Sequence, residues 1–299
     1  MLLKPDCIPC ILNMSISMQS RLSLDEIRFK EIYSEILGIP ALRGQNWEVM
    51  SPEVIEDVMN ILIRSVCSTD PFSLEKSNQN NRVQELYPYF RSCVGQASDP
   101  LYMAAKLAIF GNSIDFMMSH GFSDIEKLVT EKLEVPLPEN AFSTFEKQLK
   151  KSHLIVYFCD NAGEIVCDKL FIETIREQYN PEIVFIVRNV PTLNDATMKE
   201  AKSVGIDRIA TVVENGIEGP LPGTILRRCS GEVREWVRRA DLIISKGGGN
   251  FDTLEEEKEL LRTKNITFML LSKCRPYHAY FGVERYQPIL ANSFPALSQ

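Results

Sequence analysis

The sequence predicts an α/β fold in which a doubly wound, mainly parallel, Rossmann-like sheet follows a helical N-terminal domain. The first observation is length: 299 residues are enough for one large domain or two modest ones. The second is that the first 150 residues carry mainly helical patterns. The third is that residues 151–299 alternate apolar strand-like runs with helical patterns, which is typical of parallel sheets covered by helices. We therefore expect a helical domain over 1–150 and a Rossmann-like domain over 151–299.

The composition restricts the classes of function. It is that of an ordinary soluble protein, with 44% apolar and 24% charged residues. The net charge of −7 and the absence of a basic block argue against nucleic acid as the main partner. Apolar runs stay well short of the roughly 20 residues that span a membrane. No signal peptide is visible, so we expect a cytoplasmic protein.

Cysteine and histidine usage bears on metal chemistry. Eight cysteines in a chain without secretion signals suggest thiols and not a disulfide framework. The three histidines are not paired at metal-ligand spacing. Any metal site must therefore use mainly oxygen ligands, which favours Mg²⁺ or Mn²⁺ over Zn²⁺. The sequence leaves the oligomeric state open.

Helices dominate the first half. The stretches are residues 10–21, with a mixed pattern, residues 24–37 and 53–66, where apolar residues recur at helical spacing, residues 100–118, which are strongly apolar, and the short stretch 141–149. Gly111 interrupts the fourth of these stretches. The polar run over residues 76–81 fits either a turn or the exposed face of a helix.

The second half alternates strands and helices. The predicted strands are residues 154–159, 183–188, 208–213, 241–245 and 266–271. The predicted helices between them are residues 164–179, 193–204, 230–239 and 253–262. Gly205 is placed to end the second of these helices as a C-cap.

Polar clusters follow three of the predicted strands. Asp160 and Asn161 follow the first, residues 189–195 follow the second, and residues 246–250 follow the fourth. The carboxyl ends of parallel strands meet at one edge of a sheet, where ligands bind in such folds. Neighbouring strands lie only about 4.8 Å apart. Asp160, Asn161 and Asp195 can therefore converge as hard oxygen ligands and leave positions for water and substrate.

Each cluster also has a plain structural interpretation. The run Gly247 to Gly249 lets backbone amides approach an anion, with Lys246 adding a charge. It matches neither G-x-G-x-x-G nor the Walker pattern, and glycine is equally expected wherever a strand turns sharply into a helix. Asp160 and Asp195 could each cap a helix. Convergence of the clusters, and no single one, supports a site.

Two further stretches leave alternatives open. Asn112 and Asp115 share one face of an otherwise apolar helix, so they need structural partners or a ligand. Cys7 and Cys10 form a C-x-x-C pair without a second pair to complete a zinc site. The pair fits a redox centre, half of an unusual metal site, or two buried thiols.

The order of these stretches resembles the damage-control phosphatase family, also catalogued as domain of unknown function 89. The resemblance covers nearly the whole chain, and the cysteine pair is similar to that of the prokaryotic and archaeal subgroup. The motifs that carry it are Cys7 with Cys10; Asp70-Pro71-Phe72 with Lys76 and Asn80; Gly111-Asn112-Ser113-Ile114-Asp115; Asp160-Asn161-Ala162-Gly163-Glu164; Asn194-Asp195-Ala196; and Ser245-Lys246-Gly247-Gly248-Gly249-Asn250.

The resemblance implies a metal-dependent phosphatase that acts on small phosphorylated metabolites. It implies that a divalent metal (Mn, Mg, Co or Ni) is held by Asp160, Asn161 and Asp195. It implies a substrate- and phosphate-binding set of Lys246, Asn250, Gly247, Gly249, Asn112, Asp115 and Glu164. Gly248 departs from the family, which often carries a polar residue there.

Our hypothesis is therefore phosphomonoester hydrolysis by a metal-activated water, with Asp160, Asn161 and Asp195 as the catalytic residues. One rival makes Asp160 a phosphorylated nucleophile, as in haloacid-dehalogenase-like phosphatases, but those place a second Asp where this chain has Ala162. A non-catalytic rival is a module that binds a nucleotide or sugar phosphate. A third is a metal or redox sensor built on Cys7 and Cys10.

Overall fold

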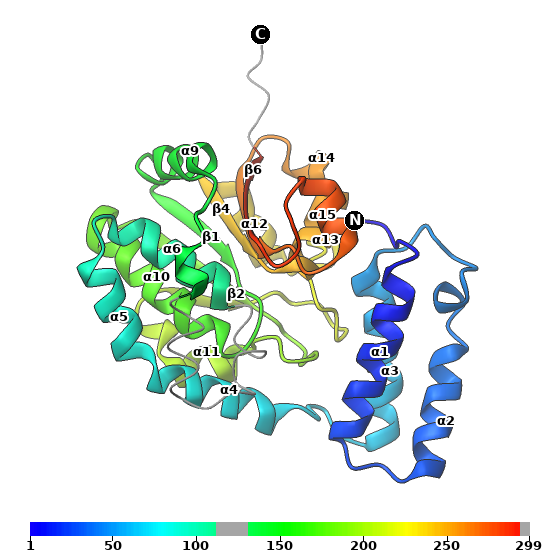
Figure 1. Cartoon of the computed structure of the whole chain (residues 1–299). Coiled ribbons are helices and arrows are strands. Elements are labelled where there is room, and N and C mark those ends of the chain that lie inside the picture. Colours follow the sequence, from blue (N-terminus) through cyan, green and yellow to red (C-terminus); the bar gives the residue numbers. More distant parts are fainter. Residues whose placement is uncertain (112–130, 294–299) are drawn as a thin grey trace.

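The structure is a computed structural model that describes residues 1–111 and 131–293 (Figure 1). Asn112 and Asp115 lie outside the described residues, so their predicted roles stay predictions. Within the described part of the chain, no helix is both long and apolar enough to cross a membrane.

A six-stranded sheet forms the centre of the second half, in the order β3-β2-β1-β4-β5-β6. The strands are β1 (Leu154–Phe158), β2 (Glu182–Val187), β3 (Thr211–Glu214), β4 (Leu242–Lys246), β5 (Asn265–Leu271) and β6 (Pro288–Ser293). The first five are parallel, and β6 pairs antiparallel with β5. Every residue of β1 and β4 is buried, as expected for central strands covered on both faces. The predicted α/β fold is confirmed.

The helices of the first half match the prediction in most places. They are α1 (Cys7–Arg21), α2 (Glu26–Leu37), α3 (Ser51–Val66), α4 (Ser73–Glu85), α5 (Tyr87–Gln96), α6 (Pro100–Phe110) and α9 (Glu139–Leu149), with a 3₁₀ turn η1 (Pro40–Arg43). The run over residues 76–81 belongs to α4, so the turn alternative is wrong. The exposed-face alternative is also wrong for Lys76, Gln79 and Asn80, which are buried.

The second half adds α10 (Glu164–Tyr179), α11 (Met198–Val204), α12 (Gly231–Arg239), α13 (Gly248–Glu256), α14 (Lys258–Leu261) and α15 (Arg275–Phe281), with 3₁₀ turns η3 (Ile206–Arg208) and η4 (Leu226–Arg228). Gly205 ends α11 in a left-handed conformation, as predicted. The predicted start of that helix at residue 193 is wrong, because the helix begins only after Thr197. There Thr197 and Glu200 form a reciprocal capping box.

Three apolar clusters make up the core. One lies between the sheet and α4, α5, α6, α9, α10 and α11, and a second lies between the sheet and α12, α13 and α15. The third joins α1, α2 and α3, which stand beside the sheet domain (Figure 1). Residues 83–110 and 137–149 therefore share a core with the strands, whereas α1–α3 have their own. The predicted domain boundary at residue 150 stays a prediction.

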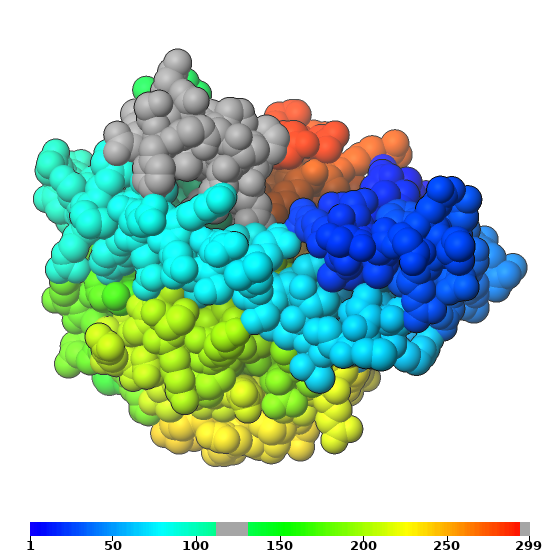
Figure 2. All heavy atoms as spheres, turned by 90° about the horizontal axis from the view of Figure 1, so that it is seen from below, coloured from blue at the N-terminus to red at the C-terminus, as the bar shows by residue number. Residues whose placement is uncertain are grey.

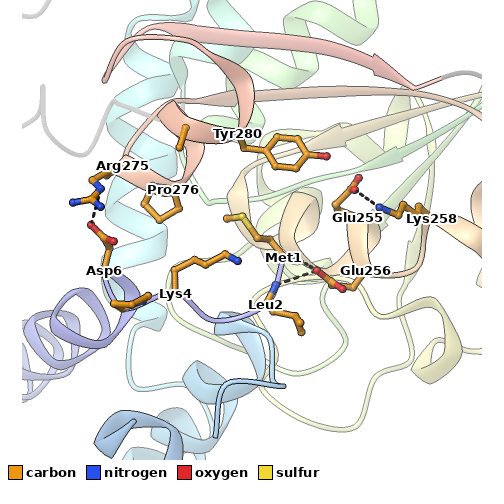
Figure 3. A pocket seen from close by; sticks show the side chains of 12 residues that line it. Met1, Leu2, Lys4, Asp6, Glu255, Glu256, Lys258, Arg275, Pro276 and Tyr280 are labelled. Carbon is orange, nitrogen blue, oxygen red and sulfur yellow. Dashed lines mark hydrogen bonds and ion pairs between the residues drawn. The ribbon is translucent and has the colours of Figure 1, made fainter.

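A surface groove of about 720 Å³ lies between the N-terminal segment and α13–α15 (Figure 3). Its charged side chains pair mainly with one another. Asp6 lies 3.8 Å from Arg275, and Glu255 lies 3.1 Å from Lys258. The residues that line the groove include none of the polar residues that follow β1 and β2.

Candidate active site

The predicted site begins in the loop that connects β1 to α10. Asp160 and Asn161 follow the buried strand directly, and Gly163 takes a φ of +77° immediately before Glu164 starts the helix. The Asp160 side chain is 89% buried, and the whole Glu164 residue is 99% buried. Because β1 lies between β2 and β4, the polar clusters after these three strands meet at one edge, as the sequence predicted.

The chain after β2 folds back onto this edge. Asn161 and Asp195 form an isolated antiparallel bridge. The backbone N–H of Ala196 donates to the carbonyl of Asp160 at 2.8 Å, and that of Ala162 donates to the carbonyl of Asn194 at 2.8 Å. These bonds bring Asp160, Asn161 and Asp195 together, although Asp195 is 34 positions further along the chain.

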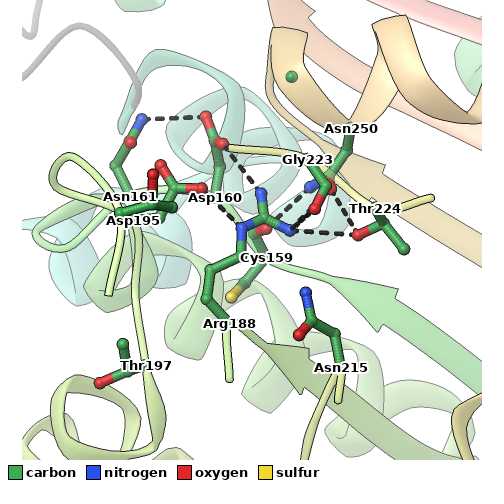
Figure 4. Close-up of polar contacts among 12 residues, drawn as sticks. Cys159, Asp160, Asn161, Arg188, Asp195, Thr197, Asn215, Gly223, Thr224 and Asn250 are labelled. Carbon is green, nitrogen blue, oxygen red and sulfur yellow. Dashed lines mark hydrogen bonds and ion pairs between the residues drawn. The ribbon is translucent and has the colours of Figure 1, made fainter. Parts of the chain in front are cut away.

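Arg188, at the end of β2, joins the two aspartates (Figure 4). Its Nε donates to Asp195 Oδ2 at 2.6 Å, and its Nη2 lies 3.8 Å from Asp160 Oδ1. Its Nη1 donates to Gly223 O, Thr224 Oγ1 and Asn250 Oδ1 at 2.9–3.1 Å. Arg188 was not among the predicted site residues, although a cation at the end of a strand, close to acidic residues in the sequence, was a usable signal.

The glycines after β4 give the Asp160 carboxylate its space. Gly247 has a φ of +78°, and a Cβ there would lie 2.0 Å from Asp160 Oδ2. A Cβ on Gly249 would lie 1.9 Å from the carbonyl oxygen of Pro222. The structural interpretation of the glycine run is therefore correct. These glycines also open α13, whose first N–H groups lack intrahelical acceptors, so their predicted role in anion binding is compatible with this geometry.

Asn250 and Lys246 lie deeper than a direct contact to phosphate would suggest. Asn250 Nδ2 donates to the carbonyls of Cys159 and Lys246, both at 2.8 Å, and ties β1 to β4. Lys246 is fully buried and donates to Ala108 O, Glu164 Oε1 and Asp168 Oδ1 at 2.5–2.8 Å. Binding of phosphate by either side chain stays a prediction and would require an exchange of partners.

Asp168 is a residue that the sequence analysis missed. Its Oδ1 accepts from both Lys246 and the Tyr157 hydroxyl, which lies at 2.7 Å. It lies four positions after Glu164, on the same face of α10, and that i, i+4 acidic pair was visible in the sequence. Lys246 thus holds the two carboxylates together behind the site.

Burial controls protonation at this edge. Burial raises the pKa of Asp160 to about 8, with further upward contributions from Asp195 and Glu164. Burial also raises the pKa of Asp195, although Arg188 opposes that shift, and raises the pKa of Asp168 to about 6. Burial alone would lower the pKa of Lys246, but Asp168 and Glu164 raise it above its ordinary value.

The donor set and the charge balance fit a divalent cation. Four carboxylates at this edge (those of residues 160, 164, 168 and 195) form ion pairs with Arg188 and Lys246. When all four are ionised they carry two more charges than these cations, and oxygen donors suit Mg²⁺ or Mn²⁺. Asn161 currently turns its Nδ2 toward Asp160 Oδ2, at 2.9 Å. Over residues 1–111 and 131–293, no three His, Cys, Asp or Glu side chains converge as a metal site, so the predicted set depends on this amide.

The cysteine pair lies away from this edge. Cys7 is half-buried and Cys10 is exposed, both at the start of α1, and both are free thiols. The ion pair between Asp6 and Arg275 brings the start of α1 next to Cys274. The three alternatives for the pair stay open.

Comparison with known proteins identifies relatives over almost the whole chain. Residues 3–289 match the family described as the damage-control phosphatase ARMT1-like domain. An uncharacterized protein of Methanocaldococcus jannaschii is 32% identical over 94% of this chain and 92% of its own length. A damage-control phosphatase of Pyrococcus horikoshii is 36% identical over 58% of each chain, and one of Archaeoglobus fulgidus is 29% identical over 72% of this chain and 73% of its own length.

A solved structure is similar as well. The crystal structure of a DUF89 family protein from Pyrococcus horikoshii superposes with a TM-score of 0.84 at 26% sequence identity. The match covers 97% of this chain and 98% of that one. The resemblance inferred from the motifs is confirmed.

Proposed function

This chain belongs to the damage-control phosphatase ARMT1-like family, and from that premise we propose that it is a metal-dependent phosphatase of small phosphorylated metabolites, such as sugar phosphates. The names of two relatives support a phosphatase. One observation of this structure supports the metal dependence. The carboxylates of Asp160 and Asp195 meet on a single guanidinium at the carboxyl edge of the sheet.

Asp160, Asn161 and Asp195 would hold the cation. When bound, a divalent cation supplies Lewis-acid polarisation of the phosphoryl group and lowers the pKa of water to a range useful at neutral pH. Arg188 favours the charged form of Asp195 and fixes its orientation, because its Nε donates to that carboxylate while its Nη1 is anchored to Gly223, Thr224 and Asn250.

The first turn of α13 would orient the phosphate. Its leading N–H groups belong to glycines and point out of a helix start, the arrangement that binds anions in many phosphate sites. Among the described residues, Nη2 of Arg188 has no hydrogen-bond partner, so one buried donor remains beside Asp160. Both features would stabilise charge on the non-bridging oxygens during transfer.

The deciding experiment is hydrolysis of an aryl phosphate by the purified chain in Mg²⁺, Mn²⁺, Co²⁺ or Ni²⁺. We expect turnover that a chelator abolishes, and loss of turnover in Asp160→Ala. Circular dichroism should show that the variant stays folded. Calorimetry should show that Asp160→Ala also loses binding of Mn²⁺.

Two outcomes would point elsewhere. Stabilisation by sugar phosphates without metal and without product would favour the non-catalytic binding module. A phospho-enzyme trapped on Asp160 would favour the aspartyl-phosphate mechanism. The predicted cytoplasmic location is not touched by either outcome and stays a prediction.

A further inference from the structure

The polar face of α4 contacts both loops that carry the predicted metal ligands. Lys76, Gln79 and Asn80 are all at least 94% buried, which is unusual for such residues unless they are paired. They lie at i, i+3 and i+4, on one face of the helix. Figure 2 shows the cyan segment that contains α4 against the yellow-green chain that follows β2. Neither the charge balance nor the anion site described above uses these three residues.

Asn80 holds the loop after β1. Its Oδ1 accepts from the backbone N–H of Gly163 at 2.6 Å, two residues after Asn161. A Cβ on Gly163 would lie 3.4 Å from Gln79 Cβ and 3.4 Å from Val83 Cγ2, so α4 packs directly on this turn. Gly163 has a φ of +77°, a conformation that glycine adopts without steric cost.

The loop after β2 is held from the same face. Gln79 Oε1 accepts from Asn194 Nδ2 at 3.4 Å, beside Asp195. Lys76 Nζ lies 2.8 Å from Asp70 Oδ2 and 3.2 Å from Glu200 Oε2. Glu200 in turn accepts from Thr197 N at 3.0 Å and Thr197 Oγ1 at 2.6 Å, which fixes the end of the loop. Asn80 Nδ2 also donates to Glu200 O and Ser203 Oγ.

We propose that this face of α4 positions Asn161 and Asp195 relative to each other, so that Lys76, Gln79 and Asn80 are positioning residues of the metal site. The inference rests on the proposed function. Its physical basis is that two separate loops must present oxygen donors to one cation. Backbone hydrogen bonds join the two loops directly, and α4 holds each loop from a third element through Asn80 and Gln79. Loss of such outer contacts typically lowers metal affinity about 10- to 100-fold.

The test compares Asn80→Ala with Asn81→Ala. Asn81 is exposed on the same helix, so the two variants share the chemical change and the gain in helix propensity. We expect Asn80→Ala to weaken Mn²⁺ binding about 10- to 100-fold by calorimetry. In the metal-free protein, hydrogen exchange should accelerate over residues 160–166 and 190–200. Asn81→Ala should match the wild type in both measurements.

Controls separate positioning from general stability. Val94→Ala shortens a buried side chain of α5 and should lower the melting temperature without changing Mn²⁺ affinity. If Asn80→Ala does not fold, the milder Gln79→Ala should weaken Mn²⁺ binding in the same direction. No Mn²⁺ binding by the wild type would overturn the proposed metal site and this inference together. Binding by the wild type that Asn80→Ala and Gln79→Ala leave unchanged would overturn this inference alone.

Discussion

At the scale of single residues, the neighbouring carboxylate of Asp160 explains why position 247 is a glycine. A Cβ at this position would overlap Asp160 Oδ2, and the φ of +78° combined with a ψ of 166° is a region almost reserved for glycine. We expect Gly247→Ala to lower the free energy of unfolding by about 1–3 kcal/mol from the backbone alone. Displacement of Asp160 should reduce kcat by about 100-fold or more.

The matched control is Gly282→Ala. Gly282 has a φ of +66° but open space around its Cβ position. It should lose about 1–2 kcal/mol of stability from the left-handed backbone and keep full activity. Urea unfolding and turnover of an aryl phosphate measure the two effects. Equal activity in the two variants would contradict the role given to Gly247.

Arg188 offers a second prediction at this scale. Its guanidinium contacts Asp195, Thr224 and Asn250 while fully buried, so Arg188→Met leaves at least one buried carboxylate without its cation. Loss of one partner from a buried ion pair costs about 3–5 kcal/mol. Arg188→Lys should be intermediate in urea unfolding, because a lysine lacks the fork that reaches several acceptors.

Arg238→Met serves as the surface comparison for Arg188. Arg238 pairs with Glu235 on an exposed helix face, so its loss should change stability very little. Stability of Arg188→Met close to that of Arg238→Met would show that the buried guanidinium is not needed to hold the two aspartates.

The sequence was informative about some residues of the site and silent about others. The convergence of Asp160, Asn161 and Asp195 could be predicted because strand ends in a parallel sheet share an edge. The partners of Lys246 could not be predicted from spacing alone, since Ala108 comes from a helix 138 positions away in the chain. A motif identifies a residue, but its contacts depend on tertiary packing.

At the scale of elements, α6 carries alanines at three positions and lies against α10 and Lys246. Ala104, Ala105 and Ala108 are completely buried. We expect Ala108→Leu to overpack this contact and lower the free energy of unfolding by about 1–3 kcal/mol. Ala279→Leu, on the exposed face of α15, is the control and should be nearly neutral. Urea unfolding of both variants tests the difference.

Predictable elements were those with strong periodicity. The five parallel strands and α3 are examples, since their apolar patterns fit one period clearly. The strand β6 was missed because it is an edge strand that starts at Pro288 and exposes its last residues. The early start given to α11 had another cause: residues 189–197 pair with the loop after β1, a tertiary contact that overrides local helical pattern.

At the scale of the whole molecule, the helices of the first half of the chain belong to two different apolar cores. Helices α1–α3 form a separate cluster, held to the sheet domain partly by Glu56 with Arg228 at 2.5 Å and by Ser51 with Asp252 at 2.9 Å. Helices α5, α6 and α9 instead complete the core of the sheet. The sequence predicted the helical content of this half, but composition alone does not show which helices share a core with distant strands.

The pH dependence of stability is a property of the whole molecule, because several buried carboxyls contribute. Burial raises the pKa of Asp168 and Asp252 to about 6 and that of Asp160 to about 8, whereas unfolded aspartates titrate near pH 3.9. Between these limits the folded chain binds more protons than the unfolded chain. Its free energy of unfolding should therefore fall as pH rises from about 4 to about 8 in metal-free buffer.

Two comparisons make this last prediction specific. Asp252 lies away from the predicted metal ligands, and Asp252→Asn removes one carboxyl whose pKa is raised. The fall in the free energy of unfolding between pH 4 and 6 should therefore become shallower. Mn²⁺ should oppose the decline, because it binds ionised carboxylates and its stabilising effect grows as protons leave them. Urea unfolding at several pH values, with and without Mn²⁺, measures both effects. Stability of the metal-free protein that rises over this range would mean that these carboxyls are already ionised in the folded chain at pH 4, and the raised pKa values given for them would then be wrong.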